Sequence, residues 1–535
     1  MLLIGIDGVP FDRLARWSAE GRLPSTAELL HESTHGPLES TIPPATSPAW
    51  QVCLTGKNPG KLGVFGFAEM RPFDVPQPPV VPVDSRSIAG QTFLDYLSRA
   101  GRRVVARQVR CCYPAWEING WMQTGFPTPG REDPRRFWPP GPATRDRLMD
   151  HRAEKRRDTG MPWGWFNLEQ SLEAYLAELR KECDVLIDDL RRMDFDCYVN
   201  VVGATDGLQH LFWLFGDPFI PITDRERRLF GDAVFRGYLL VDRLISRLLD
   251  VVPTDVPLML VSDHGATREA TRAFRLNHWL LRQGWLTPSD PNDAVERPVP
   301  PAWRDQPDTP TRRAARRARL RRNRWAAWRK QAIPLATSYL RTMLPEGVVT
   351  PLRRIPWRPY ATPALPKPSF WPIDMPRTQA YGYGFGECCG AVVINLRGRQ
   401  ANGVVEPGEA CEQLKHRIID ALRQARDPAD NRLICTSVHR REDLYHGPHV
   451  DRAPDIVFVL QDDYKLDLGV GGPVVDNRDE SRIFARSGEH SRWGLCIARG
   501  DPFPLRGERR DDARLIDIAP TVLALMRIPV PDDMD

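Results

Sequence analysis

The sequence lacks the features of a membrane-spanning, secreted or disulfide-stabilised protein. No run of 18 or more apolar residues occurs in its 535 residues, which argues against a spanning helix. The chain enters a strand-like run at Leu2–Ile6, with no basic segment, long apolar stretch or small-residue cleavage site before Asp7. Its ten cysteines form no CxxC pair and no Cys/His zinc spacing. We therefore expect a cytoplasmic protein whose cysteines are free and buried.

Acidic residues are missing from one strongly charged segment. Thr311–Lys330 carries ten Lys and Arg residues without a single Asp or Glu, whereas the net charge of the whole chain is only +5. Prolines are dense on both sides of this tract. Because such composition shifts mark boundaries, we expect residues 289–372 to form an inserted basic cap or flexible excursion between two parts of one catalytic core, 1–288 and 373–535.

Three roles remain open for the basic tract. It could be a solvated helix on the cap, a segment that lies on an anionic membrane surface, or a surface that attracts a polyanionic substrate. No specific nucleic-acid recognition is expected, because no nucleic-acid-binding fold accompanies the charge.

Apolar runs of strand length alternate with amphipathic helical segments. The predicted strands are Leu2–Ile6, Val104–Val109, Cys197–Val202, Pro257–Ser262, Val392–Leu396, Ile456–Leu460 and Leu495–Ala498. The predicted helices are Leu168–Leu190, Leu229–Leu249, Ala410–Leu422 and Leu515–Leu525. Because the strand runs are continuously apolar, burial on both faces is indicated. We expect an α/β three-layer sandwich with a mainly parallel central sheet between helices.

Metal-type ligands lie close to the ends of several of these runs. In open parallel sheets, catalytic groups gather beyond the carboxyl ends of the strands, and three aspartates occupy such positions here. Three histidines and one threonine complete the inventory of a two-metal hydrolytic centre, which can turn a hydroxyl into a nucleophile at neutral pH. The candidates are Asp7, Thr46, Asp206, His210, Asp263, His264 and His490.

Taken singly, these residues have structural alternatives. Thr46 lies in PPATSPAW, and a Thr at such a position commonly caps a helix. Asp206 and His210 are four residues apart at a predicted helix start, so they face the same way and either bind one ion or serve a structural role. An unaided threonine hydroxyl has too high a pKa to attack, so a catalytic Thr46 requires a metal.

Taken in order, five segments resemble the alkaline phosphatase superfamily. IGIDG, ATSPAWQVCLTGKNPGKLGVFGF, ATDGLQHLFW, VSDHG and GEH are most similar to its type I phosphodiesterase/nucleotide pyrophosphatase branch, particularly the bacterial phosphohydrolase/phosphomutase-like members. The resemblance is weakest between about residues 290 and 375. It implies an alkaline phosphatase-like fold and a metal-dependent hydrolase of the phosphodiesterase, phosphatase or nucleotide pyrophosphatase type.

The resemblance also implies a role for each candidate. Thr46 matches the nucleophile, because its ten-residue spacing to Gly56 is that of the family's nucleophile segment. The implied first metal site is Asp7, Thr46, Asp263 and His264, and the implied second is Asp206, His210 and His490. Two divalent ions are implied, usually zinc, and manganese or iron would also suit some of these ligands. The implied mechanism is a double displacement through phosphothreonine, which water then hydrolyses.

Two positions depart from the family pattern. The family has an Asn three residues after the nucleophile, where it helps to hold the phosphoryl oxygen, whereas this chain has Ala49. A contact of that kind is worth roughly 3 kcal/mol, so nucleotide diesters become less expected substrates. Leu62 stands where His is common, a change that touches none of the implied ligands.

A phosphohydrolase is not the only function compatible with these residues. A phosphomutase or phosphotransferase would use the same phosphothreonine but return the phosphate to a substrate hydroxyl. A degenerate, non-enzymatic member would bind phosphoesters or a membrane surface. A sulfatase is not expected, because Cys112–Trp116 ends in Trp rather than the Arg of the formylglycine motif and lies far from the nucleophile position. We expect an enzyme with a small-molecule phosphoester substrate.

Overall fold

The computed structural model describes most of the chain. The described residues are 1–68, 82–128, 133–141, 144, 148, 168–218, 220, 222–290, 373–386, 388–478, 486–501, 503 and 506–535. The predicted cap at 289–372, including the basic tract Thr311–Lys330, lies outside them except for its first two residues. Within the described ranges, no helix combines the length and apolarity needed to cross a membrane.

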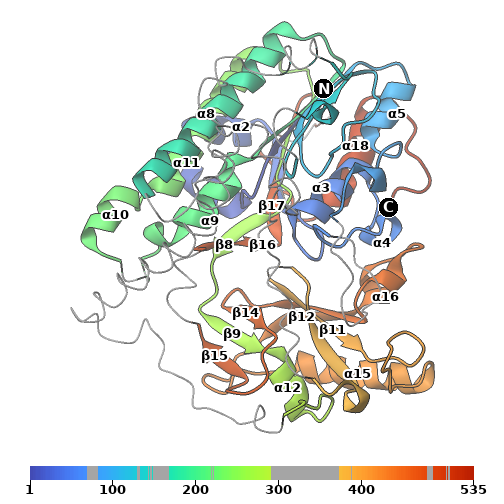
Figure 1. Ribbon diagram of the computed structural model, residues 1–535. Coiled ribbons are helices and arrows are strands. Elements are labelled where there is room, and N and C mark those ends of the chain that lie inside the picture. The colour runs from blue at the N-terminus through green and yellow to red at the C-terminus, as the bar shows by residue number, and fades with distance from the viewer. Residues whose placement is uncertain are drawn as a thin grey trace, which may run out of the picture.

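An eight-stranded sheet of described residues forms the centre of the upper lobe in Figure 1. Its spatial order is β2 (Thr34–Glu39), β17 (Trp493–Arg499), β7 (Leu258–Val261), β1 (Leu2–Ile6), β6 (Cys197–Val202), β3 (Val104–Val109), β4 (Gly120–Thr124) and β5 (Phe137–Trp138). The strands from β7 to β4 are parallel, whereas β17 runs antiparallel to β2 and β7, and β5 runs antiparallel to β4. The predicted mainly parallel α/β sheet is confirmed.

Helices cover both faces of this sheet (Figure 1). One layer contains α1 (Phe11–Ala19), α2 (Pro24–His31), α8 (Leu168–Arg192), α9 (Ala204–Gly216), α10 (Asp224–Phe230) and α11 (Ala233–Val251). The other contains α3 (Thr46–Thr55), α4 (Pro59–Leu62), α5 (Phe93–Arg99) and α18 (Ile518–Leu525). In β1, Ile4 packs into the core of the first layer and Leu3 into that of the second, since neighbouring strand residues point to opposite faces. Burial on both faces therefore explains the continuous apolarity.

A lower lobe has its own hydrophobic core. Its antiparallel sheet has the order β10 (Ala380–Gly384), β11 (Cys389–Ile394), β13 (Ile456–Leu460) and β12 (Cys435–Arg440). A second sheet has the order β14 (Tyr464–Asp467), β9 (Arg272–Arg275) and β15 (Val475–Asn477). The helices are α12 (Leu276–Arg282), α15 (Glu409–Arg423) and α16 (Arg441–Leu444). Between the lobes, β8 (Gly265–Arg268) pairs with β16 (Gly488–Ser491) as a two-stranded ribbon (Figure 1).

Two predicted strands belong to a different sheet from the one expected. The runs at Val392–Leu396 and Ile456–Leu460 correspond to β11 and β13, which pair antiparallel in the lower lobe rather than in the central parallel sheet. Both strands are buried along their whole length. A continuous apolar run shows that both faces are covered, but it does not show which strand lies alongside.

Two predicted helices are observed with altered starts. The predicted helix Leu229–Leu249 is observed as α11, and α10 ends before it at Phe230, next to Gly231. The predicted helix Leu515–Leu525 begins with a 3₁₀ turn, Leu515–Asp517, before α18. Further 3₁₀ turns are Ser85–Ser87, Pro134–Arg136, Met375–Arg377 and Val450–Arg452.

All ten cysteines are free, and all but Cys388 and Cys496 are buried, as expected.

Candidate metal centre

Three aspartates meet at the carboxyl edge of the central sheet. Asp7 directly follows β1, and Asp263 follows the parallel neighbour β7, so the two strand ends bring them together. Both are buried, at 2% and 0% exposure. Asp206 lies in the first turn of α9, which follows β6, the other neighbour of β1. The chain turns at Gly8 (φ +74°), where a Cβ would lie only 3.0 Å from Asp206 Oδ1. Gly8 therefore permits this close approach.

Three imidazoles are oriented by backbone carbonyls. The Nδ1 of His264 lies 2.9 Å from the carbonyl of Gly265, that of His490 lies 3.0 Å from the carbonyl of Pro44, and that of His210 lies 2.7 Å from the carbonyl of Gly488. A carbonyl can only accept, so the Nδ1 of His264 and that of His490 carry the proton and donate it, which leaves a lone pair on each Nε2, the arrangement that metal-ligating histidines use. The Nδ1 of His210 also lies 3.1 Å from the Nε donor of Arg486, so the carbonyl of Gly488 does not fix the tautomer of His210.

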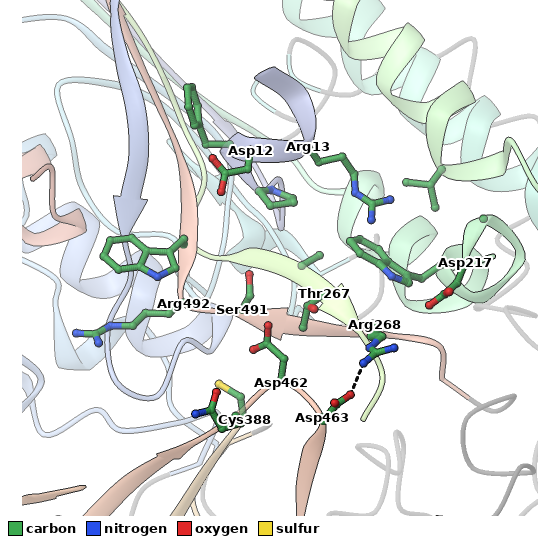
Figure 2. A pocket seen from close by; sticks show the side chains of 18 of the residues that line it. Asp12, Arg13, Asp217, Thr267, Arg268, Cys388, Asp462, Asp463, Ser491 and Arg492 are labelled. Carbon is green, nitrogen blue, oxygen red and sulfur yellow. Dashed lines mark hydrogen bonds and ion pairs between the residues drawn. The ribbon is translucent and has the colours of Figure 1, made fainter. Parts of the chain in front are cut away.

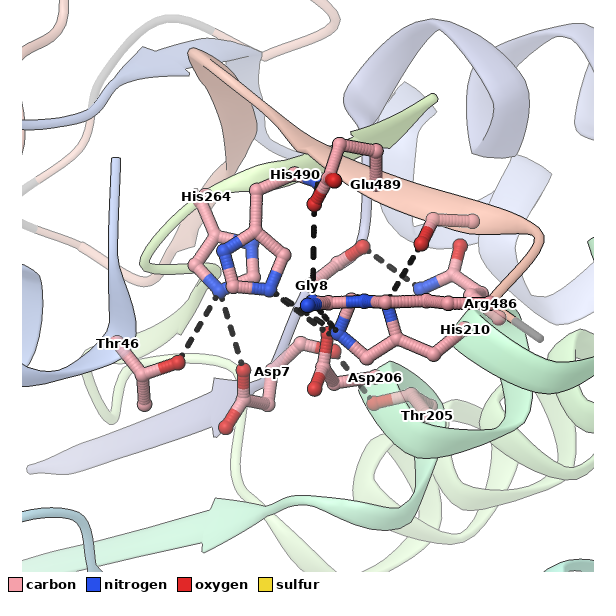
Figure 3. A network of polar contacts seen from close by, with 12 residues as sticks. Asp7, Gly8, Thr46, Thr205, Asp206, His210, His264, Arg486, Glu489 and His490 are labelled. Carbon is pink, nitrogen blue, oxygen red and sulfur yellow. Dashed lines mark hydrogen bonds and ion pairs between the residues drawn. The ribbon is translucent and has the colours of Figure 1, made fainter. Parts of the chain in front are cut away.

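These Nε2 atoms converge with the carboxylates and with Thr46 (Figure 3). His264 Nε2 lies 3.3 Å from Asp263 Oδ2, 3.6 Å from Asp7 Oδ1 and 3.4 Å from Thr46 Oγ1. Beside this group, Asp206 Oδ1 lies 3.1 Å from His210 Nε2 and 3.4 Å from His490 Nε2.

All seven candidates predicted from the sequence are therefore near neighbours, in two groups. In each of two triads, the three ligand atoms lie within 4.8 Å of one another. The triads are Asp7 with Asp263 and His264, and Asp206 with His264 and His490. His264 belongs to both.

The ligand atoms fit a pair of divalent cations. Asp7 Oδ1 and Asp263 Oδ2 are buried, yet they accept no hydrogen bond from any donor in the described part of the chain. Buried polar atoms are almost always paired in folded proteins, so such oxygens indicate a missing ligand. Carboxylate oxygens together with imidazole nitrogens form a donor set that zinc accepts.

The electrostatics of the centre favour the same conclusion. Burial and the neighbouring Asp7 and Asp206 raise the pKa of Asp263 well above its usual range. Burial, with a smaller effect of His490, lowers the pKa of His264 to about 4. Burial also lowers the pKa of His490. These two imidazoles are thus neutral and able to bind a metal at pH 7, whereas crowded carboxylates require positive charge among them.

Thr46 does not cap its helix. It is the first residue of α3, the N-cap position belongs to Ala45, and no side chain caps this helix end. The capping alternative for Thr46 is therefore wrong, because the chain enters the helix one residue earlier than capping by Thr46 would require. Ala49, one turn further on, is fully buried and has no polar group.

Two arginines at the centre were missed by the sequence analysis. Arg110 Nε donates to Asp7 Oδ2 at 3.0 Å. Arg486 Nη2 lies 2.8 Å from His210 Nε2 (Figure 3). Arg110 directly follows the predicted strand Val104–Val109, so the rule that identified Asp7 would also have identified it. Arg486 follows only the three apolar residues Ile483–Ala485, which are too few to predict a strand, so the sequence holds no comparable signal for it.

A buried glutamate of α8 supports the helix that carries Asp206. Glu182 Oε2 accepts the backbone N–H groups of Gly203 and Ala204, at 3.1 and 3.0 Å. These N–H groups belong to the start of α9 and have no partner within the helix. Burial raises the pKa of Glu182 to about 7. Glu182 was also missed, because nothing in an amphipathic helix pattern distinguishes it.

A separate cavity of about 1510 Å³ lies between the two lobes (Figure 2). Its walls include Arg13, Trp213, Arg268, Asp463 and Arg492. None of the seven candidate ligands lines it. The metal centre and this cavity are therefore distinct features.

Comparison with known proteins places the chain in a family. Residues 1–357 match the family model of type I phosphodiesterase/nucleotide pyrophosphatase. Phosphonoacetate hydrolase from Sinorhizobium meliloti 1021, solved with phosphonoacetate, is 12% identical over 98% of this chain and 94% of that chain, with a TM-score of 0.52. Murine ectonucleotide pyrophosphatase/phosphodiesterase 5 is 11% identical over 99% of this chain and 96% of that chain, with a TM-score of 0.44.

A search of curated proteins finds no match. At such low identity, the likeness to phosphonoacetate hydrolase shows a shared fold alone, whereas the family model covers well over half of the chain. The chain belongs to the type I phosphodiesterase/nucleotide pyrophosphatase family, a family of hydrolytic enzymes.

Proposed function

We propose that this chain is a two-metal phosphohydrolase that cleaves a phosphate ester or pyrophosphate bond through a phosphothreonine intermediate on Thr46. The observation that carries the proposal is the convergence of three imidazole Nε2 atoms and three carboxylates beside one threonine hydroxyl. Asp7, Thr46, Asp263 and His264 would hold one ion, and Asp206, His210 and His490 the other. Zinc is proposed because nitrogen and carboxylate donors suit it.

The chain's own residues account for positioning and for the nucleophile. Divalent cations bound here would stabilise the deprotonated hydroxyl of Thr46, activate a water and offset charge on the phosphoryl oxygens. The bond between Thr46 Oγ1 and phosphorus forms while the bond to the leaving-group oxygen breaks. Water then attacks the same phosphorus and the bond to Thr46 Oγ1 breaks, which restores the Thr46 hydroxyl and releases phosphate from a monoester or a phosphate monoester from a diester. The carbonyl of Gly265 keeps His264 in the tautomer that this site needs.

The two separate parts of the chain are proposed to form one catalytic core. Residues 1–288 supply most of the central sheet, whereas 373–535 supply β17, which pairs with β7 and β2, and α18 on one face. His490 comes from the second part and lies beside Asp206 of the first. Neither part holds the whole ligand set.

Removal of the nucleophile tests this proposal. We expect Thr46→Ala to lower turnover of 4-nitrophenyl phosphate and bis(4-nitrophenyl) phosphate by at least about 10³-fold, as loss of a covalent nucleophile does elsewhere. Thr55→Ala is a matched control, because Thr55 lies at the other end of α3 and its hydroxyl bonds the carbonyl of Gln51. Acid quenching of the wild type during turnover is expected to leave a phosphate on the peptide that contains Thr46. Full turnover by Thr46→Ala would contradict the nucleophile assignment.

Metal and product analysis separate the rival functions. We expect about two metal ions per chain by elemental analysis, following the two-metal pattern. A metal content near zero, without activation by zinc or manganese, would instead favour a non-enzymatic phosphoester-binding protein. Free phosphate as the product supports hydrolysis, whereas an isomerised substrate without free phosphate would identify a phosphomutase.

A further inference from the structure

Arg110 is a buried cation of the metal centre whose hydrogen-bonding capacity is only partly used. It directly follows β3 and so lies at the same sheet edge as Asp7. Its side chain is 14% exposed, and its Nε donates to Asp7 Oδ2 at 3.0 Å. No described residue accepts a hydrogen bond from its Nη1 or Nη2. A mostly buried guanidinium with free donors suits an anionic ligand.

The backbone around Arg110 contains a β-bulge and two residues with left-handed conformations. The pairing of β3 with β4 shifts register between Arg107 and Val109, which marks a β-bulge. Gln108 (φ +54°) and Cys111 (φ +56°), on either side of Arg110, both adopt left-handed conformations. In the described ranges, only two other non-glycine residues do so. Such conformations cost on the order of 1–3 kcal/mol each and cluster where function requires them, and bulges re-aim side chains beside active sites.

A glycine makes room for the guanidinium. Gly203 immediately precedes α9, and a Cβ at this position would lie 1.3 Å from Arg110 Nη2. The guanidinium therefore packs against the backbone at the start of the helix that carries Asp206. A guanidinium is not deprotonated in proteins, so the side chain carries a positive charge within the site.

The segment of Arg110 also contacts the helix of the nucleophile. Gln51 of α3 donates from Nε2 to the carbonyl of Cys111 at 3.4 Å, which joins the residue after Arg110 to the helix that begins with Thr46. The side chain of Ala49 has no hydrogen-bond donor. Helix α3 therefore presents no side-chain donor at the position one turn after Thr46. An external donor is needed if the phosphoryl oxygens are to be held there.

We propose that Arg110 is a substrate-binding residue whose Nη groups donate to the non-bridging oxygens of the phosphoryl group attacked by Thr46. This inference rests on the proposed function. A planar guanidinium presents parallel N–H donors to two oxygens at once. The phosphoryl group of a dianionic monoester carries more negative charge on these oxygens than that of a diester. Arg110 therefore selects substrates with a terminal phosphoryl group over diesters.

A pair of substrates with one leaving group tests this selectivity. We expect Arg110→Gln to lower kcat/KM for 4-nitrophenyl phosphate by about 10²–10³-fold, the usual loss for one charge-stabilising donor. The loss for methyl 4-nitrophenyl phosphate is expected to be at least tenfold smaller, on the same electrostatic grounds. Arg110→Lys keeps the positive charge but lacks the two parallel N–H donors of the guanidinium. It is expected to retain more monoester activity than Arg110→Gln and less than the wild type. Arg103→Gln is the control, because Arg103 pairs with Asp194 and Asp196 before the start of β3.

Binding and metal content provide a readout that does not depend on turnover. Inorganic phosphate, used as a competitive inhibitor, is expected to bind Arg110→Gln about tenfold more weakly or worse, with an unchanged metal content. Gly203→Ala displaces the guanidinium while keeping its charge, so it is expected to reproduce the selectivity change. Equal losses on both substrates, unchanged phosphate inhibition or loss of metal would overturn the proposal and leave Arg110 as a charge partner of Asp7. Failure of the proposed function is distinguishable from failure of this inference, because full turnover by Thr46→Ala contradicts the nucleophile assignment whatever the Arg110 variants do.

Discussion

Replacing Lys465 with Met removes a cation that two buried carboxylates share. Lys465 lies in β14 of the lower lobe, where its Nζ is 3.0 Å from Glu269 Oε1 and also contacts Glu489. The side chains of Glu269 and Glu489 are 1% and 6% exposed. Glu489 directly precedes His490 in β16, so this ion pair ties the ribbon of the metal centre to the lower lobe. We expect Lys465→Met to destabilise the fold and to weaken metal binding at His490.

The structure sets the size of the effect. Breaking a buried ion pair by removing one partner costs about 3–5 kcal/mol, because the other charge stays buried without compensation. Arg478 still contacts Glu269, Arg486 Nη2 still lies 3.6 Å from Glu489 Oε1, and Lys465 itself is 27% exposed, all of which reduce the loss. We therefore expect the free energy of unfolding to fall by about 2–3 kcal/mol.

Chemical denaturation of Lys465→Met, Glu489→Gln and the double variant measures the coupling between the two residues. The double variant is expected to be more stable than Lys465→Met alone, because it no longer buries the Glu489 charge. Arg397→Met is the control, since the Arg397–Glu406 pair is 61% and 58% exposed and such pairs contribute about 1 kcal/mol at most. A change below about 0.5 kcal/mol in Lys465→Met would refute the reasoning, as would a double variant no more stable than the single one.

Two further outcomes concern pH and metal. Burial lowers the pKa of His264 to about 4, so between that value and its ordinary 6.5 the unfolded chain binds a proton that the folded chain does not. Acidifying the metal-free protein from pH 7 toward 4 is thus expected to remove stability, on the order of 3 kcal/mol from this group. His264→Asn would show a shallower pH dependence in denaturation, and an unchanged one would contradict this origin. Chelation with EDTA is expected to abolish turnover and to lower the unfolding midpoint, because a bound ion at a hundredfold excess over Kd stabilises by about 2.7 kcal/mol. Zinc is expected to restore both, and turnover unaffected by chelation would exclude a metal-dependent reaction.

Much of the upper lobe could be predicted from the sequence. Leu2–Ile6, Val104–Val109 and Cys197–Val202 have the bounds expected of them, because strands covered by helices on both sides must be apolar throughout. Asp7, Asp206 and Asp263 were identifiable as a set, since parallel neighbours end at one edge. Their metal-binding roles stay predictions, as do the cytoplasmic location and the membrane or polyanion role of Thr311–Lys330.

The lower lobe and the ribbon were not predictable in the same way. The antiparallel pairing of β11 with β13 leaves no mark that separates it from a parallel one, because both strands are equally apolar. The ribbon strands Gly265–Arg268 and Gly488–Ser491 are short and polar, so no periodicity reveals them. Their pairing nevertheless holds His490 close to Asp206.

Apolar runs and polar strand ends are local properties, and the chain alone therefore specified the buried strands and helices of the upper lobe and the residue types at the strand ends, but not which strands pair. Contacts between residues far apart in the sequence decided the rest: the carbonyl of Pro44 that orients His490, and the glycine at 203 that admits Arg110 beside Asp7. Such contacts depend on how backbone segments approach one another in three dimensions. No spacing or periodicity in the chain encodes that approach on its own.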